Sequence, residues 1–290
     1  MSMKLSELVT ETRNLLMELE DGVDELFKFG AKELSDRDYA NLWALWNSCR
    51  IYEDDIVALC YSNRYWSVIV LLRSLFDGTA KFAYLLSSLD KRERERRFDC
   101  YCEYAREKDM GSIEQSSVRM LKDGEYGTGE RAAFVKNHMI RQIESEKTPS
   151  GCGARNRLAS DELSYKKITN KLAEEFSVWK MFQAHIDNLR ARANGFSHLN
   201  SLACEDIMRT ELSRIKNSCQ DFEAIMSPHL TEVCVLKRIR SEAMLRAFGK
   251  SDTRYCEIMR RHKFFWRCCS QLADEKVENM LARSYMERVK

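Results

Sequence analysis

Apolar residues recur at three- and four-residue steps through most of the chain, which is the spacing of one face of an α-helix. The helix expected over 65–89 is the most apolar, so we place it at the centre of a helical bundle. The polar segment Ser35-Asp-Arg-Asp38 is a start signal for one helix, and Asp90 can cap the start of another. The pattern predicts an all-α fold with helices over 4–30, 35–61, 65–89, 90–104, 161–189 and 199–225.

Two interruptions divide this pattern. Glycines cluster between 109 and 165, where the periodicity weakens. We expect a loop-rich insertion there with one modest helix over 130–145, serving either as surface decoration or as a substrate-binding flap. Ser227-Pro228 is predicted to end a helix, because proline disfavours the helical conformation of the residue before it. We therefore expect a bundle over 1–227 and a basic helical C-terminal extension over 228–290.

Composition narrows the class of protein only slightly. The 47 basic and 45 acidic residues leave a formal net charge of +2, which neither requires nor excludes nucleic acid. No run of 18 apolar residues occurs and the N-terminus lacks a signal-peptide core, so we expect a cytoplasmic protein without a membrane span.

The cysteines bear on both compartment and metal chemistry. There are 11, scattered through helical patterns, which favours free thiols in a reducing compartment. The close pair Cys100 and Cys102 lacks Cys-x-x-Cys spacing and nearby histidine pairs, so a zinc site is only weakly supported. We expect no metal and no cofactor.

Two charges interrupt the most apolar helix. Arg73 and Asp77 lie four residues apart, on one helix face. Charges on a mostly buried helix should pair with each other or with another group. They are expected either to form an ion pair within the helix or to contribute to a site.

Polar and basic side chains are concentrated where two helical patterns meet. On an unbroken helix Arg192 and His198 would lie about 120° apart. Their cooperation requires a break, which Asn194-Gly195 is predicted to supply, with Asn194 capping the next helix. The polar residues of this junction are Arg190, Arg192, Asn194, Ser197, His198, Asn200 and Ser201.

These residue types suit one reaction. His198 can act as general acid and base near neutral pH. Arg192 can hold a phosphate and offset the charge that develops in a transition state, while Asn194 and Ser197 can orient the imidazole. The set favours metal-independent RNA cleavage, in which the ribose 2′-hydroxyl attacks the adjacent phosphate. The alternative is a structural His198 that ties two helices together by a hydrogen bond.

A family resemblance follows from these residues. The spacing from Arg192 to His198, ahead of a long helix, resembles the Arg-x(4–6)-His motif of the HEPN superfamily. Those domains are all-helical, and many are dimeric endoribonucleases of toxin–antitoxin and phage-defence systems. Arg73-Ser-Leu-Phe-Asp77 with Asn194-Gly-Phe-Ser-His198 is also similar to a family of uncharacterised bacterial helical proteins. The resemblance implies a homodimeric ribonuclease with Arg73 and Asp77 supporting its catalytic residues.

Other basic segments extend the hypothesis or compete with it. Arg131 and His138 form a second Arg/His pair. Basic and aromatic residues alternate over 260–267, a pattern that suits stacking on nucleotides or packing on a partner helix. The mixed charges over 91–97 are typical of a solvated helix face, with an RNA-contacting patch as the alternative. The alternative function is a non-catalytic interaction protein that binds a partner protein or RNA. The predicted nucleic-acid-binding residues are Arg190, Arg260, Arg261 and Lys263.

Overall fold

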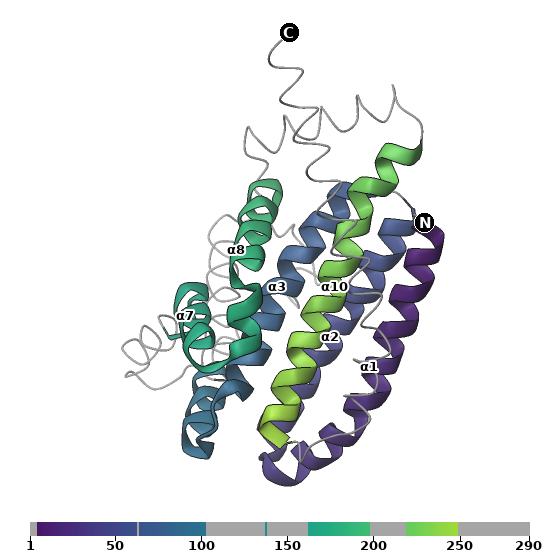
Figure 1. Cartoon of the computed structure of the whole chain (residues 1–290). Helices are drawn as coiled ribbons and strands as arrows, with labels where there is room; N and C mark the ends of the chain where they lie inside the picture. The colour runs from purple at the N-terminus through teal and green to yellow at the C-terminus, as the bar shows by residue number, and fades with distance from the viewer. Residues whose placement is uncertain (1–4, 63, 103–136, 138–161, 198–218, 249–290) are drawn as a thin grey trace. The chain divides into compact units, whose positions relative to one another are not determined.

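The computed structural model describes residues 5–62, 64–102, 137, 162–197 and 219–248 (Figure 1). These residues form helices and no strand, so the predicted all-α class is confirmed for them. They divide into two compact units, one within 1–89 and 169–290 and the other within 90–168. Nearly all of the predicted insertion lies outside the described residues.

The first three helices follow the prediction. The single helix predicted over 161–189 is wrong, because two helices separated at Phe176 occupy this part of the chain. Of the helix predicted over 199–225, only residues 219–225 are described. Residues 91–102 are also helical. The helices with printed bounds are α1 (Leu5–Glu33), α2 (Asp36–Tyr61), α3 (Tyr65–Ser87), α7 (Tyr165–Glu175), α8 (Ser177–Ser197) and α10 (Cys219–Phe248).

The predicted start signal over 35–38 and the predicted cap at Asp90 are both confirmed. The Ser35 side chain accepts a hydrogen bond of 3.2 Å from the backbone N–H of Asp38 at the start of α2. Asp90 Oδ1 accepts one of 3.0 Å from the backbone N–H of Arg92. Each cap satisfies an N–H group that the first helical turn cannot pair internally.

The apolar α3 lies at the centre of the larger unit, as its sequence predicts. It packs against α2, α10 and α8, while α1 packs against α2 and α10 (Figure 1). Helix α10 runs parallel to α1, because Lys237 contacts Glu20 and Phe248 packs on Gly30 near the ends of both helices. Helices α1 and α10 are therefore parallel neighbours that are far apart in sequence, unlike the antiparallel helices of a hairpin, which a short loop joins.

The predicted helix end at Ser227-Pro228 is wrong. Helix α10 passes through Pro228 without interruption, although an internal proline removes a hydrogen bond and costs about 3 kcal/mol. The residues that follow explain this, since Leu230, Val233 and Ile239 are almost fully buried. Their burial outweighs the local cost. Residues 228–248 therefore belong to the bundle, and the predicted extension cannot begin at 228.

A buried group of charges, here called the Glu53 network, joins α10 to the other three core helices. Lys237 Nζ pairs with Glu20 of α1 and lies 3.1 Å from Glu53 Oε2 of α2. Arg240 pairs with the other oxygen of Glu53 and donates a hydrogen bond to Thr79 of α3. Burial lowers the pKa of Lys237, and the charge of Glu20 opposes that effect.

Trp46 packs at the centre of this network. Its indole N–H donates a hydrogen bond of 2.7 Å to Glu20 Oε1. Lys237 Nζ lies 5.2 Å from the ring centroid and the Arg240 guanidinium carbon 5.5 Å, both within cation–π range. The side-chain donors and acceptors therefore meet inside the bundle rather than at its surface.

Helices α2 and α3 approach closely at Gly78. A Cβ atom at this position would lie 2.8 Å from Cys49 Sγ, and Cys49 is buried. We expect Gly78→Ala to lower the free energy of unfolding by about 1–3 kcal/mol through overpacking. Removing the sulfur should relieve the clash, so the cost of Gly78→Ala should fall when it is introduced into Cys49→Ala.

Urea denaturation of the four proteins in this cycle measures the effect. Alanine is intrinsically better than glycine in a helix by about 1 kcal/mol. A Gly78→Ala protein at least as stable as the wild type would show that propensity outweighs the contact.

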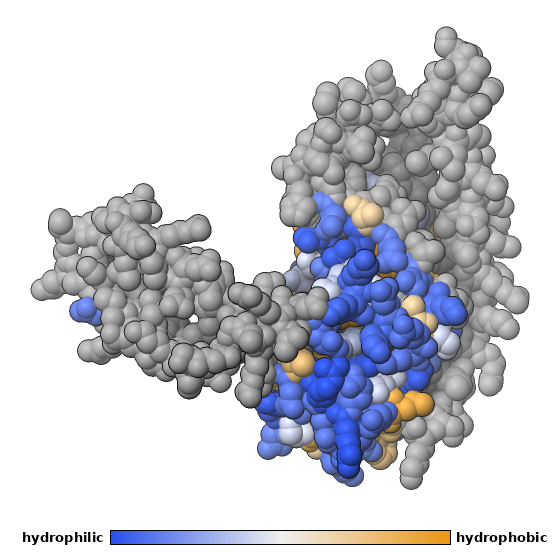
Figure 2. Space-filling model, turned by 90° about the vertical axis from the view of Figure 1, so that its left-hand side faces the viewer, coloured by the Kyte–Doolittle hydropathy of each residue, from blue (hydrophilic) through white to orange (hydrophobic). Residues whose placement is uncertain are grey.

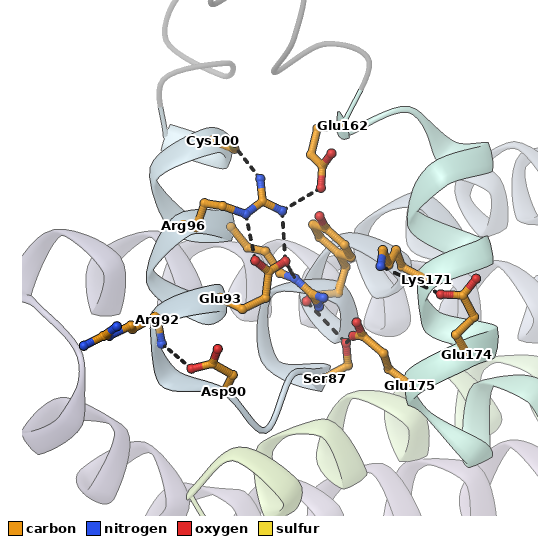
Figure 3. A network of polar contacts seen from close by, with 12 residues as sticks. Ser87, Asp90, Arg92, Glu93, Arg96, Cys100, Glu162, Lys171, Glu174 and Glu175 are labelled. Atoms are coloured by element: carbon orange, nitrogen blue, oxygen red, sulfur yellow. Dashed lines mark hydrogen bonds and ion pairs between the residues drawn. The ribbon is translucent and has the colours of Figure 1, made fainter.

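In the smaller unit, residues 91–102 are joined to Glu162 by an ion-pair network (Figure 3). Arg96 contacts Glu93 at 2.7 Å and Glu162 at 2.8 Å. The hydrogen bond from Arg96, more than that from Arg97, lowers the pKa of Glu93 to about 2. Lys91, Arg92, Glu95 and Arg96 are exposed, as expected of a solvated helix face, whereas Arg94 and Arg97 are buried on the other side.

Candidate functional site between α3 and α8

Helix α8 is continuous through Ser197, and the predicted break at Asn194-Gly195 is wrong. Asn194 lies in the last turn of this helix and does not cap the start of the next one. The local cost of glycine in a helix is only about 1 kcal/mol. Packing of α8 against α3 is sufficient to offset it.

This continuity separates the predicted site residues. Arg192 is two positions from both Arg190 and Asn194, and two positions turn an α-helix by about 200°. Arg190 and Asn194, four positions apart, share a face. Arg192 therefore occupies the opposite side of α8 from the face that these two residues form.

Two contacts show that α8 runs antiparallel to α3. Ser87, at the end of α3, donates a hydrogen bond of 3.2 Å to Glu175, just before α8 (Figure 3). Asp77, ten positions earlier in α3, pairs with Arg190, far along α8. Moving toward the start of α3 thus means moving toward the end of α8. One turn beyond the Asp77–Arg190 pair, Arg73 and Asn194 come to the same level.

Asp77 finds its partner on the neighbouring helix. Arg190 Nε donates a hydrogen bond of 2.9 Å to Asp77 Oδ1. The side chains are 21% and 31% exposed, so the pair is within reach of solvent. The predicted ion pair within α3 is wrong, because Asp77 pairs with Arg190 of α8 rather than with Arg73. Arg190, expected to bind nucleic acid, is thereby held against α3.

One turn further, two polar atoms lack partners. Arg73 Nε and Asn194 Oδ1 are buried, and within the described residues neither has a hydrogen-bond partner. An unsatisfied buried polar group costs about 1–3 kcal/mol. Arg73 Nε is a donor and Asn194 Oδ1 an acceptor, so a ligand with both an acceptor and a donor group would satisfy them. We call Arg73, Asp77, Arg190 and Asn194 the α3–α8 seam.

The remaining predicted site residues are described in part or not at all. Arg192 and Ser197 are placed only as positions of helix α8. His198 immediately follows α8 and lies outside the described residues. The same holds for the second Arg/His pair and for three predicted nucleic-acid-binding residues, namely Arg131, His138, Arg260, Arg261 and Lys263.

The Glu53 network was missed by sequence reasoning. Its signal is present in α10, where Lys237 and Arg240 stand three residues apart among apolar residues. That is the same kind of interruption that Arg73 and Asp77 make in α3. It was hidden because residues after Pro228 were assigned to an exposed basic extension.

Surface hydropathy, helix length and the grouping of potential metal ligands further characterise the described residues. The side of Figure 1 on which α8 lies faces the viewer in Figure 2, and its coloured residues are mostly hydrophilic with small separate apolar patches. Among the described helices, none has the length and apolar character needed to cross a membrane. In the same part of the chain, no three His, Cys, Asp or Glu side chains form a group suited to a metal ion.

Three comparisons with known proteins found no similar protein. No family model matches the chain, and neither the curated proteins nor the solved structures contain a match.

Proposed function

We propose that this protein is a metal-independent endoribonuclease of the HEPN kind, acting in the cytoplasm as a toxin or phage-defence effector, with RNA bound at the α3–α8 seam. His198 is the general acid and base. Arg73 takes the phosphate-binding role first expected of Arg192, because Arg192 lies on the opposite side of α8 from Asn194. Asn194 orients the substrate.

The observation that carries this proposal is the pair of unsatisfied atoms in the seam. Arg73 Nε offers a hydrogen bond and Asn194 Oδ1 accepts one, beside an ion pair that solvent can reach. The charges of Asp77 and Arg190 cancel, so the Arg73 guanidinium gives the seam a net positive charge. A phosphodiester and its ribose hydroxyls supply the acceptors and donors that complement such a site.

The reaction follows from these groups. His198 removes the proton from a ribose 2′-hydroxyl, whose oxygen attacks the adjacent phosphorus. The bond from phosphorus to the 5′-oxygen breaks, and the leaving oxygen receives the proton from the His198 imidazolium formed in the first step. Negative charge grows on the non-bridging oxygens, where the Arg73 guanidinium stabilises it. The products are a 2′,3′-cyclic phosphate and a 5′-hydroxyl.

The seam is tested by comparing two arginine variants on total RNA and tRNA in the presence of EDTA. We expect Arg73→Ala to lower the cleavage rate by about 10²–10³-fold, as expected for the loss of a transition-state hydrogen-bond donor. Arg192→Ala, a matched change on the opposite side of α8, should keep a rate within a few-fold of the wild type.

Loss of activity in Arg192→Ala alone would place the site on the other side of α8 and overturn the assignment. Absence of cleavage by the wild type would favour the alternative, a helical interaction protein that binds a partner protein or RNA. The homodimer that the family resemblance implies is a separate proposal, checked by light scattering of the purified chain.

A further inference from the structure

No short loop fixes how far α10 can slide along its own axis relative to α1, α2 and α3, so another feature must fix this position. Helices α1, α2 and α3 follow one another closely, with the next helix starting three to four residues after the last one ends. Such short connections limit how far neighbouring helices can slide. Helix α10 instead begins at Cys219, whereas the preceding described helix, α8, ends at Ser197. It runs parallel to α1.

Apolar packing alone does not select one position for α10. Its buried apolar residues recur every three or four positions along the helix. A slide of one turn, about 5.4 Å, would bring one apolar residue to the place of another. The residues that repeat in this way are Leu230, Val233, Cys234, Leu236, Ile239, Ala243 and Met244.

The Glu53 network is not periodic in this sense. Lys237 and Arg240 meet carboxylates and a hydroxyl from three different helices at one level. After a slide of one turn, one cation would take the place of the other, but Cys234 or Ala243 would fill the second place. Glu53 would then keep one cation at most, and the other would be buried without a carboxylate. Glu53, Lys237 and Arg240 are all at most 2% exposed, so solvent cannot replace the lost partners.

We propose that the Glu53 network is a register lock, which fixes the axial position of α10 against α1, α2 and α3 and adds little net stability. Buried ion pairs are often no more stabilising than apolar side chains of similar volume, because desolvation offsets their attraction. Their best-attested role is to make alternative pairings unfavourable. The network therefore acts mainly by penalising shifted positions.

A second buried pair in α10 provides a matched control. His229 Nδ1 lies 2.8 Å from Glu232 Oε2, and both residues are buried. These two residues belong to the same helix, so their contact moves with α10 in any register. Replacing them with apolar residues removes a buried polar pair without removing an ion pair to another helix. The His229 ring also lies 5.6 Å from the Tyr65 ring of α3, centroid to centroid, and leucine keeps an apolar side chain at that contact.

The test compares two apolar variants of the full chain. One carries Glu53→Met, Lys237→Met and Arg240→Leu, and the control carries His229→Leu and Glu232→Met. In each, Phe248 is replaced by the photo-crosslinking residue p-benzoylphenylalanine. The Phe248 ring lies 3.4 Å from where a Cβ of Gly30 would be, so crosslinks report which part of α1 faces the end of α10.

Mass spectrometry then locates the crosslinks. In the otherwise unchanged chain and in the control, we expect products centred on Gly30. In the network variant, we expect products one turn away as well, near Leu26 or Leu34, with an unfolding temperature at or above that of the unchanged chain. Crosslinks confined to Gly30 would overturn the proposal. An unfolded network variant would also overturn it, because the network would then be required for stability itself.

Discussion

His198→Ala lowers the rate of RNA cleavage by about 10²–10⁴-fold if this residue is the general acid and base of the proposed reaction. Both proton transfers would lose their catalyst, while Arg73 and Asn194 would still bind the substrate. We therefore expect the loss in kcat, with a KM close to that of the wild type. Single-turnover cleavage of a defined RNA in EDTA measures it.

A matched control uses another histidine of the chain. His138→Ala removes the imidazole of the second Arg/His pair and should leave the rate unchanged. The reverse outcome, with activity lost only in His138→Ala, would move the catalytic role to the pair of Arg131 and His138. Equal cleavage by the wild type and both variants would exclude these two histidines as catalysts.

Glu53→Ala should lower the free energy of unfolding by about 3–5 kcal/mol, the cost of breaking a buried ion pair by removing one partner. The carboxylate contacts both Lys237 and Arg240, and neither cation is accessible to water that could replace it. Alanine would leave Lys237 with Glu20 alone and Arg240 with the Thr79 hydroxyl but no carboxylate. Equilibrium denaturation with urea, followed by circular dichroism, gives the difference.

The control for this variant is an exposed carboxylate on the same helix. Asp55→Ala should change the free energy of unfolding by less than about 0.5 kcal/mol, as surface substitutions usually do. A Glu53→Ala protein no less stable than Asp55→Ala would show that water or a rearranged partner satisfies both cations.

Much of the fold could be predicted because its determinants are local. Helical periodicity and the caps at Ser35 and Asp90 depend on residues within a few positions of one another. Pro228 was misinterpreted for the converse reason. Its local cost is real, but the residues after it are buried against helices distant in sequence, and their burial decides the outcome.

The candidate site shows the same limit. Sequence identified Arg73 and Asp77 as charges that need partners, since both lie in an apolar helix. It could not identify Arg190 as the partner of Asp77, because the two are 113 positions apart. Asn194-Gly195 was expected to break α8, but a propensity difference of about 1 kcal/mol is small beside tertiary packing. Because α8 is continuous, Arg192 lies on the opposite side of the helix from Arg190 and Asn194.

The parallel packing of α10 on α1 has a consequence for the order of folding. Glu20 and Lys237 are separated by 217 positions, whereas α1, α2 and α3 contact their neighbours in the chain. Contacts between distant segments require closing a long loop before they bring any gain. During synthesis, the first three helices leave the ribosome long before α10 and have time to associate. We expect α10 to join last, so Glu53 remains without its cations until α10 has been synthesised.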